Sequence, residues 1–200
     1  SSAAADVYKR QVIVDAAAQL PPASNFWNFT HQGADLAIFS GGKDLSGPQA
    51  SGLILGSKEL IEIISGLGAP HHGIGRPMKV GKEEMMGLLA AVERYLSLNH
   101  EQLFETYEAL VTFCINELDG LKGLRAIRDY PNEAGQPVAR TKVVPPESHN
   151  KDTVIQDLLQ GEPMISVAPS VTENALLLNP MKVKDGEASI VKERILEVMG

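Results

Sequence analysis

The sequence predicts an α/β fold in two parts. In the first half, apolar runs of strand length alternate with amphipathic stretches of helix length, an order typical of α/β proteins. From about Leu121 onward the segments follow a different order, which predicts a compact two-layer α/β unit with its own small core. A hydrophobic content of 44% is enough for such cores, and 22% charged residues is ordinary for a globular protein.

The first half contains three strand patterns. Val12–Val14 is a short continuous apolar run, which predicts a strand buried on both faces. The stretch "NFWNFTHQG" predicts a short helix that ends at Gly33. Ala34–Phe39 predicts a second buried strand, and Gly52–Gly56 ("GLILG") predicts a third.

A capped helix follows the third strand. Ser57 is the expected N-cap, Glu59 and Glu62 lie near the helix start, and Gly66 is the expected terminator. Residues 68–81 ("GAPHHGIGRPMKVG") form a loop that is too rich in turn residues to be an idle linker.

A long helix is expected over residues 82–98. Its apolar stripe consists of Met85, Leu88, Leu89, Val92 and Leu96. Asn99 then caps a second long helix.

The second half has a regular pattern without internal repeats or low-complexity tracts. The expected order is strand 124–130, polar turn 131–136, strand 137–144, helix 152–160, strands 164–168 and 174–179, and helix 186–199.

Charge and cysteine content exclude several classes of protein. The net charge of −7 argues against a broad nucleic-acid face or a basic membrane patch. No run reaches the roughly 20 apolar residues of a membrane span. Cys114 is the only cysteine, so a disulfide within the chain is excluded, and its apolar helical setting predicts core packing. We expect a reducing, cytoplasmic setting.

The first 11 residues look foreign to the fold. The hexapeptide "DVYKRQ" (Asp6–Gln11) resembles a translated sequencing-library adapter and runs into the first strand without a turn. We expect residues 1–11 to be a non-native leader and natural sequence to begin near Val12, partway through a larger protein.

Lys43 is the first candidate for chemistry. It lies in "SGGKDLSGPQASG" (residues 40–52), directly after a predicted strand. A lysine that is partly desolvated in a glycine-lined site loses its proton more readily and becomes an imine-forming nucleophile. A phosphate-binding lysine and an exposed loop lysine are the alternatives. A nucleotide P-loop is not one of them, because Ala37 and Asp44 fail two of its requirements.

Asp15 is the second candidate. It closes the first strand, where a buried carboxylate needs a cationic or N–H partner, although a turn-capping role is the alternative. It precedes Lys43 by 28 residues (43 − 15), enough for one helix and a return to a neighbouring strand. Both residues would then lie at the carboxyl ends of adjacent strands, where open α/β sheets bind ligands. Ser40 can offer its hydroxyl to a phosphate, and Ala17 is small enough for a flat ring to lie against it.

Three segments carry a family resemblance. In chain order, "VDAAAQLPP", "GADLAIFSGGKDLSGPQASGLILG" and "GIGRPMKVGKEEMMGLLAAVERYL" resemble fold-type-I pyridoxal phosphate (PLP) enzymes related to bacterial seryl-tRNA(Sec) selenium transferase. The likeness is greatest to the shorter selenium transferase-like, or aminotransferase class V-fold, proteins, which include sugar-acid ammonia lyases. It implies that residues 12–98 form the C-terminal part of a large domain with a mostly parallel sheet, and residues 99–200 a small C-terminal α/β domain.

The resemblance also implies residue roles. Lys43 would hold pyridoxal 5'-phosphate (PLP) as a Schiff base and later move the α-proton. Asp15 would pair with the pyridinium nitrogen, and Ser40 would help to bind the phosphate. Gln49 would lie in a loop that approaches the active site of a partner subunit. Arg76 would bind a substrate carboxylate or phosphate, with a surface loop arginine as the alternative.

Weaker candidates share the loop of Arg76. They are Lys79 and the pair His71 and His72, and we expect no metal site there because no acidic or cysteine ligand clusters with the histidines. By the resemblance, the glycine-rich phosphate loop and the ring-stacking residue would lie upstream of Asp15. We therefore expect this chain to hold half of an active site and to be inactive alone.

The resemblance predicts a PLP-dependent lyase or transferase. It would act on a small amino-acid-like substrate by α-proton abstraction, followed by elimination or group transfer, as a homodimer or larger homo-oligomer. Nucleic acid and membrane partners are not expected. The alternatives are a true L-seryl-tRNA(Sec) selenium transferase, which would show a basic N-terminal domain, and a non-catalytic protein that kept the fold.

Overall fold

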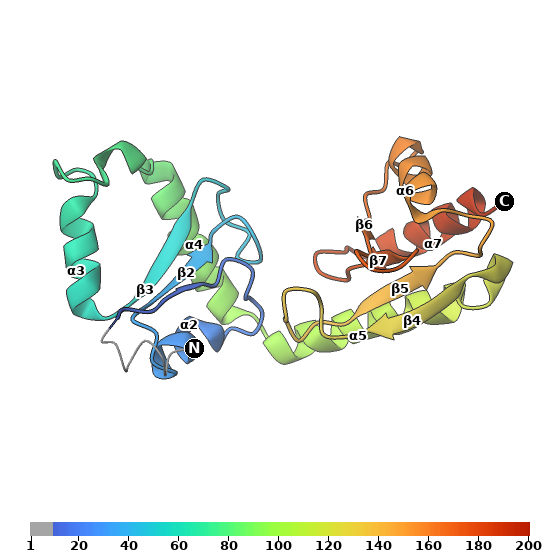
Figure 1. Cartoon of the computed structure of the whole chain (residues 1–200), viewed down its shortest axis with the longest axis horizontal. Coiled ribbons are helices and arrows are strands. Elements are labelled where there is room, and N and C mark those ends of the chain that lie inside the picture. Colours follow the sequence, from blue (N-terminus) through green and yellow to red (C-terminus); the bar gives the residue numbers. More distant parts are fainter. Residues whose placement is uncertain (1–9) are drawn as a thin grey trace. The chain divides into compact units, whose positions relative to one another are not determined.

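The computed structural model describes residues 10–200, so most of the proposed leader lies outside the described residues. The chain divides into two compact units, residues 1–100 and 101–200, which are coloured blue to green and green to red in Figure 1. The assignment of residues 12–98 to a large domain and of residues 99–200 to a small C-terminal domain stays a prediction.

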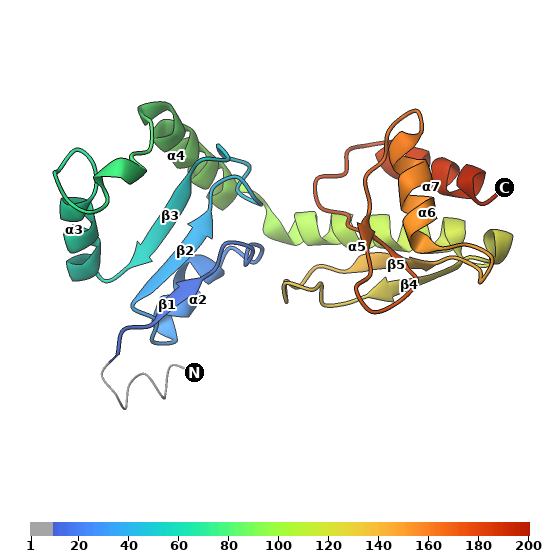
Figure 2. The same ribbon diagram turned by 45° about the horizontal axis from the view of Figure 1, so that its top comes forward.

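The first unit is a three-stranded sheet with helices. Its elements are β1 (Ile13–Asp15), α2 (Asn25–His31), β2 (Leu36–Ser40), β3 (Gly52–Gly56), α3 (Lys58–Leu67), a 3-10 turn η1 (Arg76–Met78) and α4 (Lys82–Ser97). The strand order is β1-β2-β3, as Figure 2 shows. The α/β class and each of these predicted strands and helices are confirmed. Pairing of β1 with β2 is parallel, but β3 runs antiparallel to β2 because the loop between them turns straight back.

The core of the first unit lies on one face of this sheet. Phe39 of β2 is 1% exposed, and its ring centroid lies 5.1 Å from that of Phe26 in α2. Tyr95 of α4 is equally buried and contacts Phe26 edge-on at 6.0 Å. Leu45, from the loop after β2, is fully buried in the same cluster. Aromatic edge-to-face contacts and apolar burial therefore attach α2, α4 and the loop to one face.

The opposite face of the sheet corrects the prediction for Val12–Val14. Ile13 is 58% exposed, and Ile38 and Ile54, which pair across β2 and β3, are 36% and 37% exposed. A strand is buried on both faces only where other elements pack against both. Here α2 and α4 pack against the face that bears Phe39, and the core cluster contains the strand residues of that face and not the isoleucines. The three isoleucines are instead exposed on this face, with Ile38 between Asp15 and Ile54.

Two helices of this unit differ in detail from expectation. The Ser57 hydroxyl accepts a hydrogen bond from the Leu60 N–H at 3.4 Å, as an N-cap should, but α3 runs past Gly66 and is capped at Gly68. In α4 the predicted stripe is half wrong. Leu88 and Val92 pack in the core beside Ala91 and Tyr95, whereas three residues of the stripe are exposed. These are Met85, Leu89 and Leu96. The buried face is centred on Ala91 and Tyr95, one position away from the stripe that a purely apolar pattern favours.

The core assignment predicts a contrast between two neighbouring residues. We expect Phe39→Ala to destabilise the first unit by about 3–5 kcal/mol, because it opens a cavity among aromatic rings. Ile38→Ala, on the exposed face, should cost less than about 1 kcal/mol. Urea unfolding followed by the fluorescence of Trp27, the only tryptophan, reports on this unit. Equal losses for the two variants would contradict the assigned core face.

The second unit places helices against an antiparallel sheet. Its elements are α5 (His100–Leu118), η2 (Leu121–Gly123), β4 (Arg125–Asp129), β5 (Arg140–Val144), α6 (Lys151–Gln160), β6 (Ala168–Pro169), β7 (Leu176–Leu178) and α7 (Glu187–Val198). The strand order is β4-β5-β7-β6, and every pairing is antiparallel. The predicted elements are confirmed, but β6 is only two residues long because most of the predicted strand 164–168 has no strand partner.

One face of the second sheet carries the core. Val143 of β5 and Leu176 of β7 are fully buried with Leu158 of α6 and Ile195 of α7. Cys114 of α5 belongs to the same cluster and is 8% exposed, so the prediction of core packing for this cysteine is confirmed.

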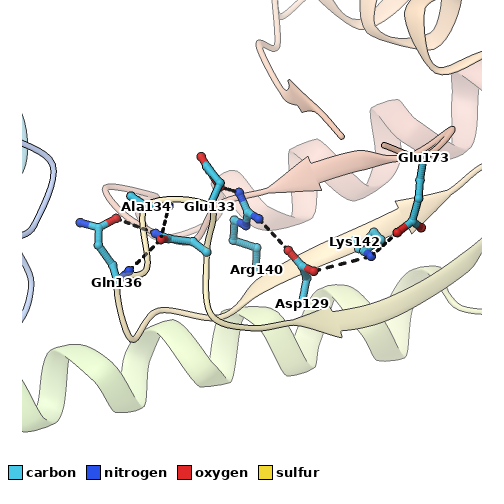
Figure 3. A network of polar contacts seen from close by, with 8 residues as sticks. Asp129, Glu133, Ala134, Gln136, Arg140, Lys142 and Glu173 are labelled. Carbon is cyan, nitrogen blue, oxygen red and sulfur yellow. Dashed lines mark hydrogen bonds and ion pairs between the residues drawn. The ribbon is translucent and has the colours of Figure 1, made fainter. Parts of the chain in front are cut away.

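The other face of the second sheet carries an ion-pair network (Figure 3). The Arg140 guanidinium donates to the Asp129 carboxylate at 2.7 Å and also pairs with Glu133. The Lys142 ammonium lies 3.6 Å from Asp129 and 2.9 Å from Glu173. The hydrogen bond to Glu173 raises the pKa of Lys142, since it favours the charged form. Paired charges thus occupy this face, with the Arg140 side chain buried among them, while the helices pack on the other face.

Candidate active site

The parallel pairing of β1 and β2 brings two predicted site residues together. Asp15 pairs with Ile38, and the register continues one step further because the Ala16 N–H donates to the Ile38 carbonyl at 2.8 Å. Ser40 lies two residues beyond Ile38, so it projects on the same face as Ile38 and Asp15. A carboxylate and a hydroxyl therefore share one face at the carboxyl ends of adjacent parallel strands, the edge where such sheets bind ligands.

The environment of Asp15 differs from the prediction. Its side chain is exposed, and its Oδ1 accepts a hydrogen bond from the Ala17 N–H at 3.1 Å. The expected burial was inferred from the apolar strand before it, but Asp15 lies on the exposed face with Ile13. This local turn holds the carboxylate at the strand end and leaves Ala17 half-buried beside it.

The loop after β2 is closed by its own hydrogen bonds. The Gly41 N–H donates to the Ser51 carbonyl at 2.9 Å, and the Gly47 N–H donates back to the Gly41 carbonyl at 2.8 Å. The Gln49 side-chain amide donates to the Gly42 carbonyl at 3.1 Å. We call residues 41–51 the lysine loop. Its ends meet in the antiparallel pair β2–β3, so the loop is a compact unit and not an open linker.

Two contacts fasten the lysine loop to the core and to α4. Leu45 is fully buried in the core of the first unit, and Asp44 beside it is 8% exposed. The Arg94 guanidinium of α4 donates to the Leu45 carbonyl at 3.2 Å. A buried leucine and a bond to a helix fix the backbone on one side of Lys43, so the loop presents its lysine from a rigid base.

The two glycines before Lys43 have a steric role within the loop. A Cβ at Gly41 would lie 2.0 Å from the Ser51 hydroxyl oxygen, and one at Gly42 would lie 2.8 Å from the Gln49 Cα. These positions accept only glycine because the returning strand of the loop approaches them closely. The structure therefore assigns the glycines to closing the loop, whereas the sequence predicted that they line the site of the lysine.

Lys43 itself is exposed, which corrects the expected desolvation. Asp44 and Leu45, the next two residues, are buried, whereas the Lys43 side chain is exposed to solvent. Within the described residues, the amine thus stands free of ion-pair partners above the end of β2. The Ser46 N–H donates to the Lys43 carbonyl at 3.0 Å, which holds the backbone of the turn.

The remaining candidates lie in the loop between α3 and α4. Arg76, Lys79, His71 and His72 are all exposed, and the Arg76 guanidinium donates to the Pro70 carbonyl of the same loop. The loop is pinched where the Gly75 N–H donates to the Leu67 carbonyl at 2.9 Å. The structure brings Asp15, Ala17, Ser40 and Lys43 to one end of the sheet, whereas the contacts of Arg76 stay within its own loop.

The part of the chain that the structure describes offers neither a metal cluster nor a membrane-spanning helix. No group of three or more histidine, cysteine, aspartate or glutamate side chains is arranged to hold a metal ion. No described helix has both the length and the apolar character needed to cross a membrane.

Similar solved structures define the class of protein. Alanine–glyoxylate aminotransferase from Nostoc sp. superposes with a TM-score of 0.65 at 14% identity, covering all of this chain and 56% of that one, which shows the shared fold. D-glucosaminate-6-phosphate ammonia-lyase superposes with a TM-score of 0.74 at 30% identity, covering 99% of this chain and 51% of that one. The chain therefore has the fold of the PLP-dependent aminotransferase-like proteins of fold type I, as the resemblance predicted.

The family follows from sequence similarity. Residues 12–120 match the family of L-seryl-tRNA selenium transferase (SelA), and the chain belongs to this family. A D-glucosaminate-6-phosphate ammonia lyase of Salmonella typhimurium is 31% identical over 94% of this chain, and a 5'-C-glycyluridine monooxygenase-decarboxylase of Streptomyces sp is 33% identical over 90%. The chain spans 48% and 44% of these relatives, about half their length. The predicted resemblance is confirmed, and the relatives include lyases and transferases of PLP-dependent families.

Sequence reasoning missed the residues that hold the site in place. Leu45 and Arg94 lie 49 positions apart and meet at one hydrogen bond. The signal for Leu45 was present, because a lone leucine in a loop of glycine, serine and proline has a reason to be buried. No pattern in the sequence pointed to Arg94.

The closed loop predicts a steric penalty at Gly42. We expect Gly42→Ala to destabilise the first unit by about 1–3 kcal/mol. The new methyl group would meet the end of the Gln49 side chain, which can move, and also the Gln49 Cα at 2.8 Å, which moves only with the backbone. The matched control is Gly66→Ala in α3, where a Cβ meets nothing within 4 Å. It should stabilise the unit by up to about 1 kcal/mol through helix propensity. Thermal unfolding of both variants distinguishes them, and a neutral Gly42→Ala would show that the lysine loop is not closed as described.

Proposed function

We propose that this chain is the lysine-bearing part of a PLP-dependent enzyme that abstracts an α-proton from a small amino-acid-like substrate. Elimination or transfer of a group would follow. The observation that carries the proposal is the gathering of Asp15, Ser40 and the lysine loop at the carboxyl ends of two parallel strands. Membership of a family with PLP-dependent lyases and transferases supports it.

The donor set fits the cofactor. PLP presents a ring nitrogen, a phosphate and an aldehyde carbon, and this sheet end offers a carboxylate, a hydroxyl and a primary amine. The Asp15 and Lys43 side chains are exposed, so a bound group can reach them. Bound PLP would supply an electron sink for the pair of electrons left when the substrate Cα loses its proton.

Each residue of this chain has a separate task in the proposal. The Asp15 carboxylate would keep the ring nitrogen protonated by charge pairing, and the Ser40 hydroxyl would donate to the phosphate. Lys43 would anchor the aldehyde carbon through Nζ, and after a substrate amine replaces it, the same Nζ would take the α-proton as a general base. Arg76 would bind a carboxylate or phosphate of the substrate with its planar set of donors.

We also propose a homodimer or larger homo-oligomer in a reducing, cytoplasmic setting, with Gln49 near the partner's active site. Large exposed apolar side chains on and before α4, including Met78, Met85 and Met86, support self-association. The buried free thiol of Cys114 supports the reducing setting.

Hydrogen exchange at the substrate Cα tests the proposed role of Lys43. The complete protein that contains this chain would be loaded with PLP and incubated in D₂O with a panel of small anionic amino acids and amino-sugar acids. Loss of the α-proton signal by NMR and release of ammonia would be followed together. We expect Lys43→Ala to slow exchange by about 10²–10⁴-fold, the usual contribution of a positioned general base.

Two controls keep the exchange experiment specific. Lys43→Arg retains the charge but lacks a transferable amine, so it should be as slow as Lys43→Ala. Lys58→Ala removes another exposed lysine, in α3 and outside the candidate site, and should leave exchange unchanged. Full exchange by Lys43→Ala, or an equal loss for Lys58→Ala, would contradict the assignment of Lys43 as the base.

A further inference from the structure

The second unit contains a cavity that the proposed function does not use. It has a volume of about 500 Å³ and is built only from residues of this unit. Representative wall residues are Leu110, Val111 and Cys114 of α5, Thr141 of β5, Leu178 of β7 and Val191 of α7. Its volume falls within the roughly 300–1,000 Å³ of cavities that hold small molecules.

The walls of the cavity are mostly apolar and incompletely packed. Leu110, Leu178 and Val191 lie against the core of the second unit but are only partly buried. Apolar side chains that face an unfilled space lose dispersion contacts on that side, so an apolar occupant would restore them. The cavity therefore favours a molecule with a largely hydrocarbon surface.

The buried polar groups in its wall, Thr141 and Cys114, are neutral. Thr141 is 1% exposed, and its hydroxyl donates to the Val111 carbonyl at 3.4 Å. Burial raises the pKa of the Cys114 thiol, and it does so more strongly than the Thr141 hydroxyl lowers it. The thiol thus stays protonated near neutral pH. A charged ligand group would meet no opposite charge at these residues and would lose its hydration.

The charged side chains that line the cavity are exposed, and one of them already makes a hydrogen bond within the protein. Lys182 and Glu187 both line the cavity and are exposed to solvent. The Glu187 carboxylate, in the first turn of α7, accepts a hydrogen bond from the Lys184 N–H at 2.9 Å. The helix start therefore already carries an acidic group, which disfavours an anion there.

We propose that this cavity is a binding site for a small, uncharged, mainly apolar molecule. Apolar walls, neutral buried polar groups and exposed charges at its lining together select that class of ligand. The site belongs to the second unit and is independent of the PLP chemistry proposed for the first.

A matched pair of fluorescent probes tests the proposed ligand class on the whole chain. N-phenyl-1-naphthylamine is uncharged and apolar, and 8-anilinonaphthalene-1-sulfonate has the same rings with an added sulfonate. We expect saturable binding of the uncharged probe with one site per chain, and at least about tenfold weaker binding of the sulfonate, which loses hydration in a neutral apolar cavity. Equal affinities, or no saturable binding of the uncharged probe, would overturn the proposal.

Two substitutions on α7 locate the bound probe. Val191→Trp should fill the cavity and weaken binding by about tenfold or more, since the indole occupies the space that the probe needs. Ile190→Trp is the matched control, because Ile190 is 42% exposed and does not line the cavity. Equal binding by both variants would place the probe on another apolar surface and refute the assignment.

Alkylation of Cys114 gives a second readout without any substitution, so the proposal stays testable even if Val191→Trp fails to fold. Because this thiol is the only cysteine, iodoacetamide labels one site that mass spectrometry can follow. A saturating concentration of the uncharged probe should slow the labelling severalfold. An unchanged labelling rate under saturation would show that the cavity is not the binding site.

Discussion

The burial of Leu45 is the constraint on which the geometry of the candidate site depends. This residue draws the middle of the lysine loop into the core of the first unit, where it meets the aromatic side chains of β2, α2 and α4. The Arg94 bond to its carbonyl fixes the same point from α4. Lys43 lies two residues earlier in the chain, so the direction of its side chain follows from how Leu45 is anchored. The catalytic candidate is thus positioned by hydrophobic packing and not by a polar partner of its own.

The sheet provides the second condition for the site. Parallel pairing of β1 with β2 brings the two strand ends together, and the antiparallel return of β3 closes the loop that carries the lysine. The face that bears Asp15 also bears the exposed isoleucines of all three strands. Polar candidate residues and an uncovered apolar surface therefore share one side of the sheet, while the aromatic core occupies the other. Such a surface is suited to further packing.

Periodicity and turn chemistry were sufficient to predict the α/β class and the order of the elements, whereas the roles of the site residues stay a prediction. They could not predict the direction of β3, because a short connection with glycine and proline permits either a return or a crossover. Apolar runs also do not reveal whether one or both faces of a sheet are covered, so the burial of Ile13 and Asp15 was overestimated. The contact of Arg94 with the lysine loop depends on two segments far apart in the chain, and no local pattern encodes it.

The two units differ in the side chains that occupy the two faces of their sheets. In the first, one face is aromatic and the other remains apolar and exposed. In the second, helices cover one face and the ion pairs of Arg140 and Lys142 occupy the other (Figure 3). The cavity lined by α5, α7 and the sheet belongs to that unit alone.

Covalent trapping of the cofactor on Lys43 is the most direct test of the account. The complete protein would be incubated with PLP, reduced with borohydride, digested, and searched by mass for the pyridoxyl-bearing peptide. The account predicts a label on Lys43 that disappears in Lys43→Ala and persists in Lys79→Ala. No label, or one scattered over exposed lysines in both variants, would contradict the assignment of Lys43 as the cofactor anchor.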